Sequence, residues 1–558
     1  MNGRYLNLME RILSAYSDRH IEDYFEKAKA EGLKEHGFPR LTANIGILIA
    51  NGRRLDLLPL FKEMMDFCCK SIPRVKAAND FSVREIVLCI HEIEKSGAVE
   101  KDVTEQWRAQ LKTIEPESCY TKYAKTVDDY VRNWALFTGV SEFYRQRAGL
   151  CDTTDFIETQ IGSQLKWLDE NGMYMDSAIS KIHQPIVYDL VPRGLFMLLI
   201  HGGYRGKYYE DITAALEKSE KLTLSMQSVT GELAFGGRSN QFLHNESWLA
   251  AAFEYTAAKY KKAGNIHLAK KYKAAADLAL SALERELEKE PITHIKNRFP
   301  TSSFYGCENY AYFDKYMITA ASNLYASSMF CDDTIEPAEA DTSPMIAQTS
   351  RYFHKIFMRA GGYYLEFDTS GDAHYDASGL GRVHKLGAPS EICMSVPCPK
   401  YPGYKVDIDE PKALSLAVGI KNGGEWTFAT DEDSVYKVLN TNTSGDSALL
   451  TLATTFSGGK TVEATYFVDE CGVSIELSGK GDIAFLLPAF HFDGEGYTAV
   501  HSGDGVLEVS YKGYTCRYTA GGEVHECDGL AANRNGHYRR FFTSGKDHLN
   551  IKIEIFKQ

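Results

Sequence analysis

Residues 236–248 carry more polar side chains than the packing of a helix requires. Two glycines precede Ser239 and Asn240, either of which suits an N-cap, so we expect a helix to begin there. Positions i, i+3, i+4 and i+7 from Gln241 would then share a face bearing two amides, an imidazole and an indole, which makes poor core. The face is either a satisfied polar cluster or the lip of a substrate pocket. Its candidate residues are Arg238, Asn240, Gln241, His244, Asn245, Glu246 and Trp248.

Residues 304–316 form a second candidate segment, because four tyrosines fall within it. Helical spacing would place Tyr305, Glu308 and Tyr312 on one face. Tyrosine stripes usually belong to a core or an interface. Aromatic rings with hydroxyl tips also suit sugars, since the rings stack on apolar sugar faces while the hydroxyls bond the edges. The candidates for either role are Tyr305, Glu308, Tyr310 and Tyr312.

Residues 372–385 form a third segment, in which two histidines, an arginine and a lysine surround glycines. We expect a loop, either solvated or reaching toward the helical part of the chain. In the second case Arg382 and His384 would supply positive charge for a carboxylate. A weaker polar helix face carries Tyr188, Asp189 and Arg193.

The elements that must position these groups are helical up to about residue 330. Residues 247–262 and 266–287 each return apolar side chains at three- and four-residue intervals, with a break at 263–265, which predicts an αα-hairpin. Several such hairpins make a solenoid or a closed α/α toroid. No exact repeat is present, which disfavours a regular solenoid.

The composition changes at residues 332–343, which are acidic, contain proline and lack periodicity. Beyond them, short alternating runs separated by glycine turns predict antiparallel strands, for example residues 448–456 followed by 461–468. The expected fold class is therefore a multidomain α+β protein. It consists of an α/α toroid over residues 1–335, which carries the site, and an antiparallel β-sandwich over residues 346–558.

The net charge, the apolar runs and the cysteines limit which partners, cellular location and cofactors we expect. The net charge of −13 over 558 residues argues against nucleic acid. No apolar run is long enough to span a membrane, and the N-terminus lacks a signal-peptide pattern, so we expect a cytoplasmic protein. The twelve cysteines are scattered and predict free thiols without a zinc set. We expect no metal and no other cofactor, and the sequence is compatible with a homo-oligomer.

The order of these features resembles the heparinase II/III-like polysaccharide lyases and their alginate-lyase relatives. Those families join an α/α toroid to a β-sandwich and carry an Asn/His pair at the start of a toroid helix. Here the pair is His244-Asn245, and Tyr305 follows one hairpin later. The pair is reversed from the usual Asn-His order, and the sandwich lacks an HxHxD-type run. The plan is also similar to that of β-glucuronidases and unsaturated glucuronyl hydrolases.

The resemblance implies an enzyme that acts on uronic-acid-containing oligosaccharides. In a lyase, Asn245, Gln241 and Arg382 would neutralise the substrate carboxylate. Tyr305 or Tyr310 would serve as base and acid, assisted by His244 or His384. A hydrolase would instead need two carboxyl groups, and Glu246 and Glu308 are the best pair, with Asp189 in reserve.

The wealth of Asn, His, Tyr and Arg favours elimination. A non-catalytic glycan-binding or scaffold protein is the third alternative. Convergence of His244, Tyr305 and His384 in one pocket would distinguish an enzyme from a scaffold. No P-loop, GxGxxG, HExxH or GxSxG motif supports another class. A cytoplasmic enzyme would meet imported fragments, so we expect exo action on short acidic oligosaccharides.

Overall fold

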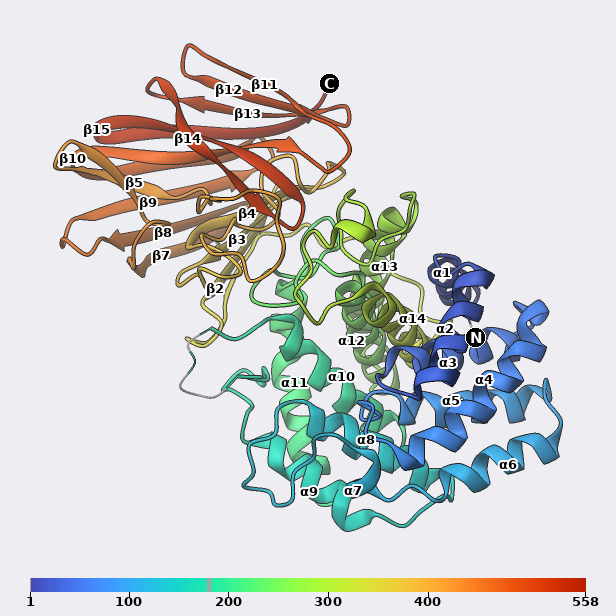
Figure 1. Cartoon of the computed structure of the whole chain (residues 1–558). Helices are drawn as coiled ribbons and strands as arrows, with labels where there is room; N and C mark the ends of the chain where they lie inside the picture. Colours follow the sequence, from blue (N-terminus) through green and yellow to red (C-terminus); the bar gives the residue numbers. More distant parts are fainter. Residues whose placement is uncertain (1, 178–180, 182) are drawn as a thin grey trace.

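The computed structural model describes residues 2–177, 181 and 183–558, and places a helical half before a half built of strands (Figure 1). The helices are α1 (Gly3–Leu13), α2 (Asp18–Glu31), α3 (Gly37–Ala50), α4 (Leu58–Ser71), α5 (Val83–Ser96), α6 (Lys101–Leu111), α7 (Pro116–Cys119), α8 (Trp134–Arg147), α9 (Thr154–Leu165), α10 (Val187–His201), α11 (Tyr209–Ser225), α12 (Leu243–Lys262), α13 (Ile266–Leu287) and α14 (Phe313–Phe330).

Six of these helices form a closed ring. In it α3, α5, α8, α10, α12 and α14 each contact the next, and α14 returns to contact α3. Outside the ring, α4 packs on α3, α9 on α8, α11 on α10 and α13 on α12. The helical half is therefore an α/α toroid, as the sequence predicted, and the predicted hairpin is the pair α12 and α13.

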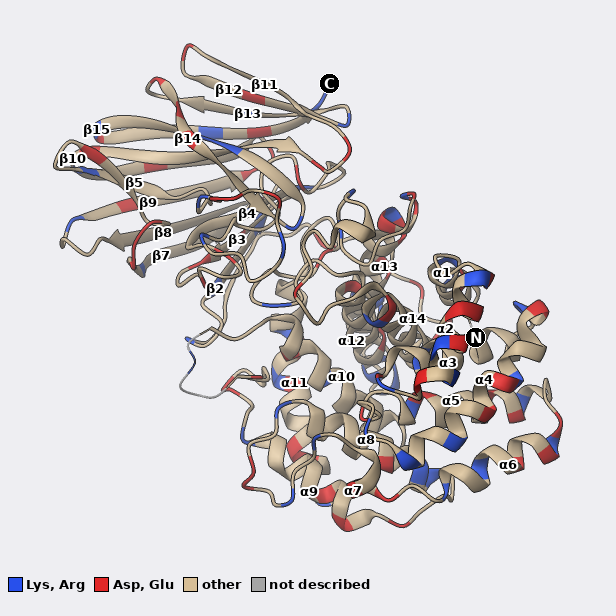
Figure 2. Ribbon diagram, in the orientation of Figure 1, with Lys and Arg blue, Asp and Glu red and all other residues tan. Residues whose placement is uncertain are grey.

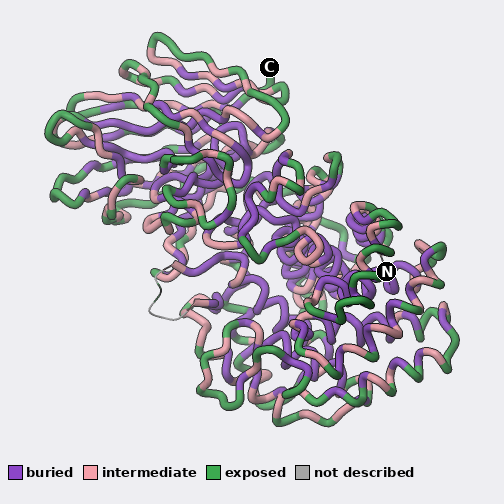
Figure 3. Tube along the Cα trace, viewed as in Figure 1, coloured by how far each residue is buried: buried purple, intermediate pink, exposed green. Residues whose placement is uncertain are grey.

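The place of a helix in the toroid follows from its sequence pattern. The outer helix α1 buries Tyr5, Leu8 and Ile12, whose spacing puts one apolar stripe toward the core. The inner helix α12 is instead buried at every residue from Leu243 to Glu254, because α10, α13 and α14 surround it. Figure 3 shows the same contrast, with burial concentrated inside the toroid and between the sheets.

The strands follow the linker after α14. They are β1 (Met345–Gln348), β2 (Lys355–Ala360), β3 (Tyr363–Asp368), β4 (Gly379–Lys385), β5 (Val418–Asn422), β6 (Glu425–Phe428), β7 (Val435–Ser444), β8 (Ser447–Thr455), β9 (Thr461–Asp469), β10 (Gly472–Phe492), β11 (Ala499–Gly503), β12 (Val506–Tyr511), β13 (Tyr514–Ala520), β14 (Val524–Asn533) and β15 (Gly536–Lys557).

Within the described residues these strands form two antiparallel sheets. One has the order β1-β2-β3-β4, and the other follows the path β11-β12-β13-β15-β10-β9-β8-β7 with β5, β6 and β14 attached. Ile356 and Leu365 of the small sheet share one hydrophobic core with Leu450, Ile475 and Ile553 of the large sheet. The two sheets therefore pack face to face as a sandwich, as predicted.

The sandwich docks on the toroid through the turn that joins β14 to β15. Arg534 in this turn pairs with Glu308, and the Asn535 side chain donates to the Lys296 carbonyl at 3.1 Å. Elsewhere, the Phe235 backbone N–H donates to Glu366 of β3 at 3.0 Å. Buried polar contacts from both halves thus fix how the sandwich sits on the toroid.

Local structure in the three candidate segments differs from the sequence prediction. Helix α12 begins at Leu243 rather than near Ser239, and both Ser239 (φ 56°) and Gln241 (φ 61°) have left-handed backbone. Gln241 therefore precedes the helix and does not share its face. A loop runs from Phe304 to Tyr312, since α14 begins only at Phe313. The expected helical face through Tyr305 is absent for the same reason.

The third segment is also different, because residues 379–385 form strand β4 rather than a loop. Among the described residues, none of the helices combines the length and the apolar composition needed to cross a membrane. All twelve cysteines lie in the described part of the chain and are free thiols, as predicted.

Candidate active site

A cavity of about 450 Å³ lies within the ring of inner helices. Each of the six contributes to its wall, so residues spread over almost the whole helical half meet at one place. Among them are Arg40 of α3, Arg84 of α5, Phe137 of α8, Tyr188 of α10, His244 of α12 and Tyr316 of α14. The segments just before α12 and α14 add Arg238 and Tyr310.

Four hydroxyl groups form a continuous chain in and beside this cavity. The Ser239 hydroxyl lies 3.2 Å from that of Tyr310 and 3.1 Å from that of Tyr188, which in turn lies 3.3 Å from that of Tyr316. The left-handed backbone at Ser239 lets its N–H donate to Glu308 at 2.6 Å while its side chain joins the tyrosines. A proton can therefore pass between Tyr310 and Tyr316 through hydrogen-bonded hydroxyls.

Two tyrosines of this chain, Tyr310 and Tyr316, hold their protons. Burial, together with the charge of neighbouring tyrosines, raises the pKa of Tyr310 and Tyr316 well above the ordinary value. Tyr310 nevertheless remains 40% exposed, so a ligand can reach it. These two hydroxyls are suited to donate a proton rather than to accept one.

His244 has the opposite character. Burial, reinforced by the charge of Arg40, lowers the pKa of His244 to about 3, so the imidazole is neutral at physiological pH. Its ring packs against the Tyr316 ring with centroids 5.5 Å apart, and its Nδ1 has no hydrogen-bond partner. This neutral imidazole next to the hydroxyl chain is a weak base, because burial disfavours its protonated form, and an anionic ligand beside it would favour that form.

Positive charge predominates in the cavity wall. The described lining includes six Lys and Arg side chains but only two carboxylates, Glu35 and Asp176. Asp176 pairs with Arg238, whose guanidinium carbon lies 4.5 Å from the centre of the Tyr188 ring. Glu35 accepts from the Tyr24 hydroxyl and from the Gly37 N–H. Both carboxylates are thus already engaged.

The cation excess is local. Acidic and basic residues are spread over both halves of the molecule (Figure 2), and the chain as a whole carries −13. Two cavity cations, Arg132 and Lys315, form no ion pair with any described carboxylate, and Nη1 of Arg84 lacks a hydrogen-bond partner. These groups can bind an anionic ligand without first giving up a partner.

Two larger cavities adjoin the ring cavity. One, of about 550 Å³, shares Lys34, Glu35 and Lys315 with it. The other, of about 640 Å³, shares Arg132 and Arg238 and borders the sandwich. The ring cavity therefore lies between these two cavities. Toward the other end of the ring, beyond Arg84, the next cavity has a volume of only about 10 Å³.

Five of the predicted site residues line the ring cavity, and they come from both of the first two candidate segments and from α10. They are Tyr188, Arg238, His244, Trp248 and Tyr310.

The expected convergence of His244, Tyr305 and His384 does not occur. Tyr305 does not line the ring cavity but stacks on Phe299, with ring centroids 3.6 Å apart. His384 of β4 lies in the interface between the toroid and the sandwich, where its ring is hydrogen-bonded to Thr230 at 3.0 Å and to Ser395 at 3.2 Å. Both side chains are committed to packing between the halves.

The predicted carboxyl pair also lies away from the cavity. Glu246 is fully buried and accepts from Lys296 at 2.5 Å and from the Leu233 N–H at 3.1 Å. Glu308 binds Arg534 and the Ser239 N–H, so it supports the hydroxyl chain from behind. Neither carboxylate is available to flank a glycosidic bond.

The remaining candidates serve other contacts. Asp189 forms a bidentate pair with Arg193 within α10, and Arg382 pairs with Glu366 at 3.1 Å. Tyr312 is 46% exposed and lines the adjoining 550 Å³ cavity. Asn240, Gln241 and Asn245 are buried, and none of the three is part of the cavity wall.

Sequence reasoning missed several cavity residues on helices outside the three segments. Arg40 and Arg84 each interrupt an apolar helical run, which is a readable signal because unpaired arginine is rarely buried. Here Glu85 pairs with both, at 2.9 Å each, and holds them in the wall. Ser239 gave no signal beyond its suitability as an N-cap. Among the described residues no cluster of His, Cys, Asp and Glu has the makings of a metal site.

Comparisons with known proteins give structural likenesses only. Neither a protein-family model nor a curated protein matches the sequence. A heparan sulfate lyase HepC mutant from Pedobacter heparinus aligns at 9% identity over 93% of this chain and 76% of its own, with a TM-score of 0.45. Chondroitin AC lyase of Streptomyces coelicolor A3 aligns at 11% identity over 98% of this chain and 82% of its own, with a TM-score of 0.46. A family 88 glycosyl hydrolase from Bacteroides vulgatus aligns at 12% identity over 58% of this chain and 98% of its own, with a TM-score of 0.39.

Proposed function

We propose that this protein is a carbohydrate-active enzyme that cleaves uronic-acid-containing oligosaccharides by β-elimination in the ring cavity. The observation that carries the proposal is the chain of hydroxyls from Tyr310 to Tyr316, which ends beside the neutral imidazole of His244. Proton donor, proton acceptor and free cations are thereby gathered at one place, as an elimination requires.

The proposed reaction removes the proton on C5 of the uronate and breaks the bond between C4 and its glycosidic oxygen. Arg132 and Lys315 neutralise the substrate carboxylate, which makes the C5 proton more acidic. The His244 imidazole takes this proton, the electron pair forms the C4=C5 double bond, and Tyr310 donates its proton to the leaving oxygen. The hydroxyl chain then returns a proton to Tyr310, and His244 loses the one it gained.

We further propose action at chain ends of short oligosaccharides. A cavity of about 450 Å³ suits a small ligand, since ligand pockets run from roughly 300 to 1,000 Å³. The narrowing beyond Arg84 favours entry of a chain end over passage of a polymer through the ring. Internal cleavage of long polymer, seen as a rapid fall in viscosity with few new ends, would contradict this part of the proposal.

A glycoside hydrolase is the second candidate, favoured by one observation. Asp176 lines the cavity as a buried carboxyl whose pKa is raised by burial, a property of general acids in hydrolases. Inverting hydrolysis needs a second carboxyl roughly 6.5–9.5 Å away, and Glu35 is the other carboxylate in the wall. Its two hydrogen bonds hold it in place.

The test is to incubate the protein with short glucuronate, galacturonate and mannuronate/guluronate oligosaccharides. Ultraviolet absorbance of the unsaturated uronate and release of reducing ends are followed together. Both signals rising supports elimination, and Tyr310→Phe should reduce them together. New ends without absorbance would refute elimination, and Asp176→Asn would then be the informative variant. Binding without either signal would make the protein a glycan-binding one.

A further inference from the structure

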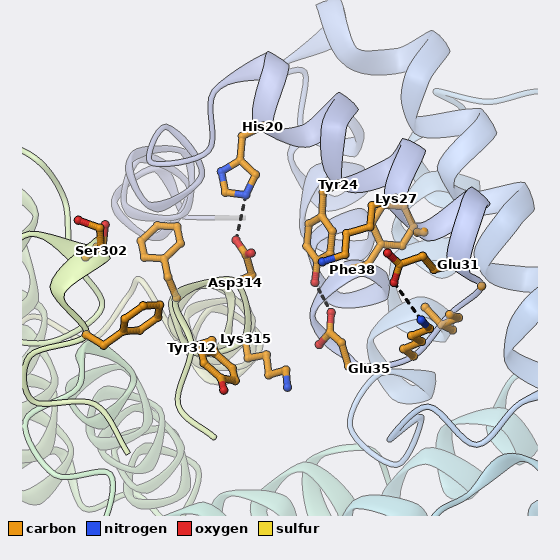
Figure 4. Close-up of a pocket in the computed structure, with 17 residues that line it drawn as sticks. His20, Tyr24, Lys27, Glu31, Glu35, Phe38, Ser302, Tyr312, Asp314 and Lys315 are labelled. Atoms are coloured by element: carbon orange, nitrogen blue, oxygen red, sulfur yellow. Dashed lines mark hydrogen bonds and ion pairs between the residues drawn. The ribbon is translucent and has the colours of Figure 1, made fainter. Parts of the chain in front are cut away.

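The 550 Å³ cavity beside the ring lies between α2 and the segment that leads into α14 (Figure 4). Tyr312 and Lys315 lie across it from Tyr24 and Lys27 of α2. Nothing in the proposed elimination uses its side chains except Lys315, so its composition needs a separate explanation.

Two aromatic rings are exposed in this cavity. Phe304 and Tyr312 are each 46% exposed, and their rings meet edge to face with centroids 6.0 Å apart. Phe304 holds a left-handed backbone, φ 56°, which bulky residues rarely adopt. Phe38, which lies across the cavity from Tyr312 (Figure 4), and Leu33 are buried lining residues and add apolar surface. Exposed rings in a cavity with such a lining favour a ligand with an apolar face, such as a pyranose.

The charges around the rings favour an anionic ligand. Each of the three lining carboxylates is already engaged, because Glu31 pairs with Lys34 at 2.9 Å, Asp314 with His20 at 3.0 Å, and Glu35 accepts from Tyr24. The three dashed contacts in Figure 4 are these interactions.

The cations of the cavity are less engaged. Lys27 is exposed and forms no ion pair with any described residue. Lys315 is partly buried and also has no ion pair with a described residue, and its Nζ lies 5.4 Å from the centre of the Tyr312 ring. An acidic sugar stacked on Tyr312 would therefore have ammonium groups available to its carboxylate or sulfate.

The cavity adjoins the proposed reaction site, because Lys34, Glu35 and Lys315 line both. We propose that it is a sugar subsite for the third residue of an acidic oligosaccharide whose first two residues occupy the ring cavity. This inference rests on the proposed substrate class but not on the reaction type. In this inference Phe304, Tyr312 and Lys27 make the protein bind longer oligosaccharides more tightly than disaccharides.

The experiment compares the binding of disaccharides and tetrasaccharides of each uronate series by calorimetry. It uses Tyr310→Phe protein, so that turnover does not consume the ligand. We expect the tetrasaccharide to bind roughly tenfold more tightly, about 1.4 kcal/mol, as one additional stacked sugar would give. Adding Phe304→Ala, Tyr312→Ala or Lys27→Ala should bring the ratio of the two dissociation constants close to one.

Two matched variants control this experiment. Tyr497→Ala removes an exposed ring from the sandwich, and Lys29→Ala removes an exposed lysine of α2 that does not line the cavity. Both should keep the tenfold ratio, and thermal melting should show every variant folded. Equal affinity for the two lengths, or an unchanged ratio in the Phe304, Tyr312 and Lys27 variants, would overturn the subsite.

The outcomes separate this inference from the proposed reaction. Variant-sensitive tetrasaccharide binding, together with a wild-type protein that forms no unsaturated product, would support the subsite and refute the elimination. Unsaturated product with length-independent affinity would refute the subsite and support the elimination.

Discussion

Glu308 of the toroid and Arg534 of the sandwich form a bidentate ion pair, with N–O distances of 2.6 and 3.1 Å, and both side chains are only 2% exposed. Oε1 of Glu308, which lies 2.6 Å from Arg534, also accepts the Ser239 N–H. The Ser239 hydroxyl links Tyr310 to the rest of the hydroxyl chain. The turn between β14 and β15 therefore positions a group in the candidate site without lining the cavity itself.

Arg534→Met should lower stability and activity together. It leaves the Glu308 carboxylate buried without its partner, which costs about 3–5 kcal/mol. The double variant Glu308→Leu/Arg534→Met should recover most of the stability but not the rate, since replacing Glu308 also removes the acceptor of the Ser239 N–H. Arg539→Met is the matched control, because its pair with Glu526 is exposed and should cost less than about 1 kcal/mol. Full activity in a folded Arg534→Met protein would show that the pair does not position the site.

Tyr310→Phe should reduce kcat by roughly 10²–10⁴-fold, the contribution of one well-placed acid. The Michaelis constant should change little, because the ring remains and only the hydroxyl is lost. Initial rates of unsaturated product over a range of substrate concentrations measure both quantities. Tyr497→Phe, which removes a hydroxyl from an exposed sandwich residue, should behave as wild type.

His244→Gln should alter how stability depends on pH. The pKa of His244 falls from 6.5 to about 3 in the folded protein, so between these values the unfolded chain binds a proton that the folded one excludes. The free energy of unfolding contributed by this residue therefore falls as the pH falls from 6.5, by about 1.4 kcal/mol per unit.

Between pH 7 and pH 5 the wild-type protein should thus lose about 2 kcal/mol more than His244→Gln. Chemical denaturation at the two pH values measures the difference. His501→Gln, an exposed change in β11, should lose as much as the wild type. An identical loss in His244→Gln would mean that this imidazole is accessible to protons in the folded state.

Arg132→Ala should weaken substrate binding more than turnover. Its guanidinium has no described ion-pair partner, so its removal takes a cation from the cavity without leaving a buried charge behind. We expect the Michaelis constant for an acidic trisaccharide to rise roughly tenfold, as the loss of about 1.4 kcal/mol implies. The effect should shrink with added salt, because screening weakens the attraction in both proteins. Lys125→Ala, an exposed change outside the cavity wall, is the control.

The fold could be predicted because its patterns are local. The spacing of apolar residues in α12 and α13 and the alternation of β8, β9 and β12 lie within single elements, so a short window contains the signal. The closure of the toroid was predicted only as one of two arrangements. It depends on contacts between α14 and α3, which lie at opposite ends of the helical half.

The site could be predicted only in part, for a related reason. His244, Tyr310 and Arg238 stood in polar segments that the sequence exposes. Tyr305 and His384 carry the same chemical groups, but Phe299 and Ser395 engage them in the interface between the halves. Which of two similar side chains faces the cavity depends on the left-handed residues before α12 and on the loop before α14, and neither has a periodic signature.

The contact between α3 and α14 also bears on how the protein matures during synthesis. The ring can close only after residues 313–330 have been synthesised, because they contact residues 37–50. Glu308, which accepts the Ser239 N–H, gains its ion-pair partner only when Arg534 has been synthesised. A ribosome releases the N-terminal part first, so the candidate site cannot assemble until nearly the whole chain has emerged. A chain that ends before α14 cannot close the ring, and one that ends between α14 and Arg534 would have a toroid without its anchored hydroxyl chain. Fragments that end before Arg534 should therefore lack the proposed activity, however well their individual helices form.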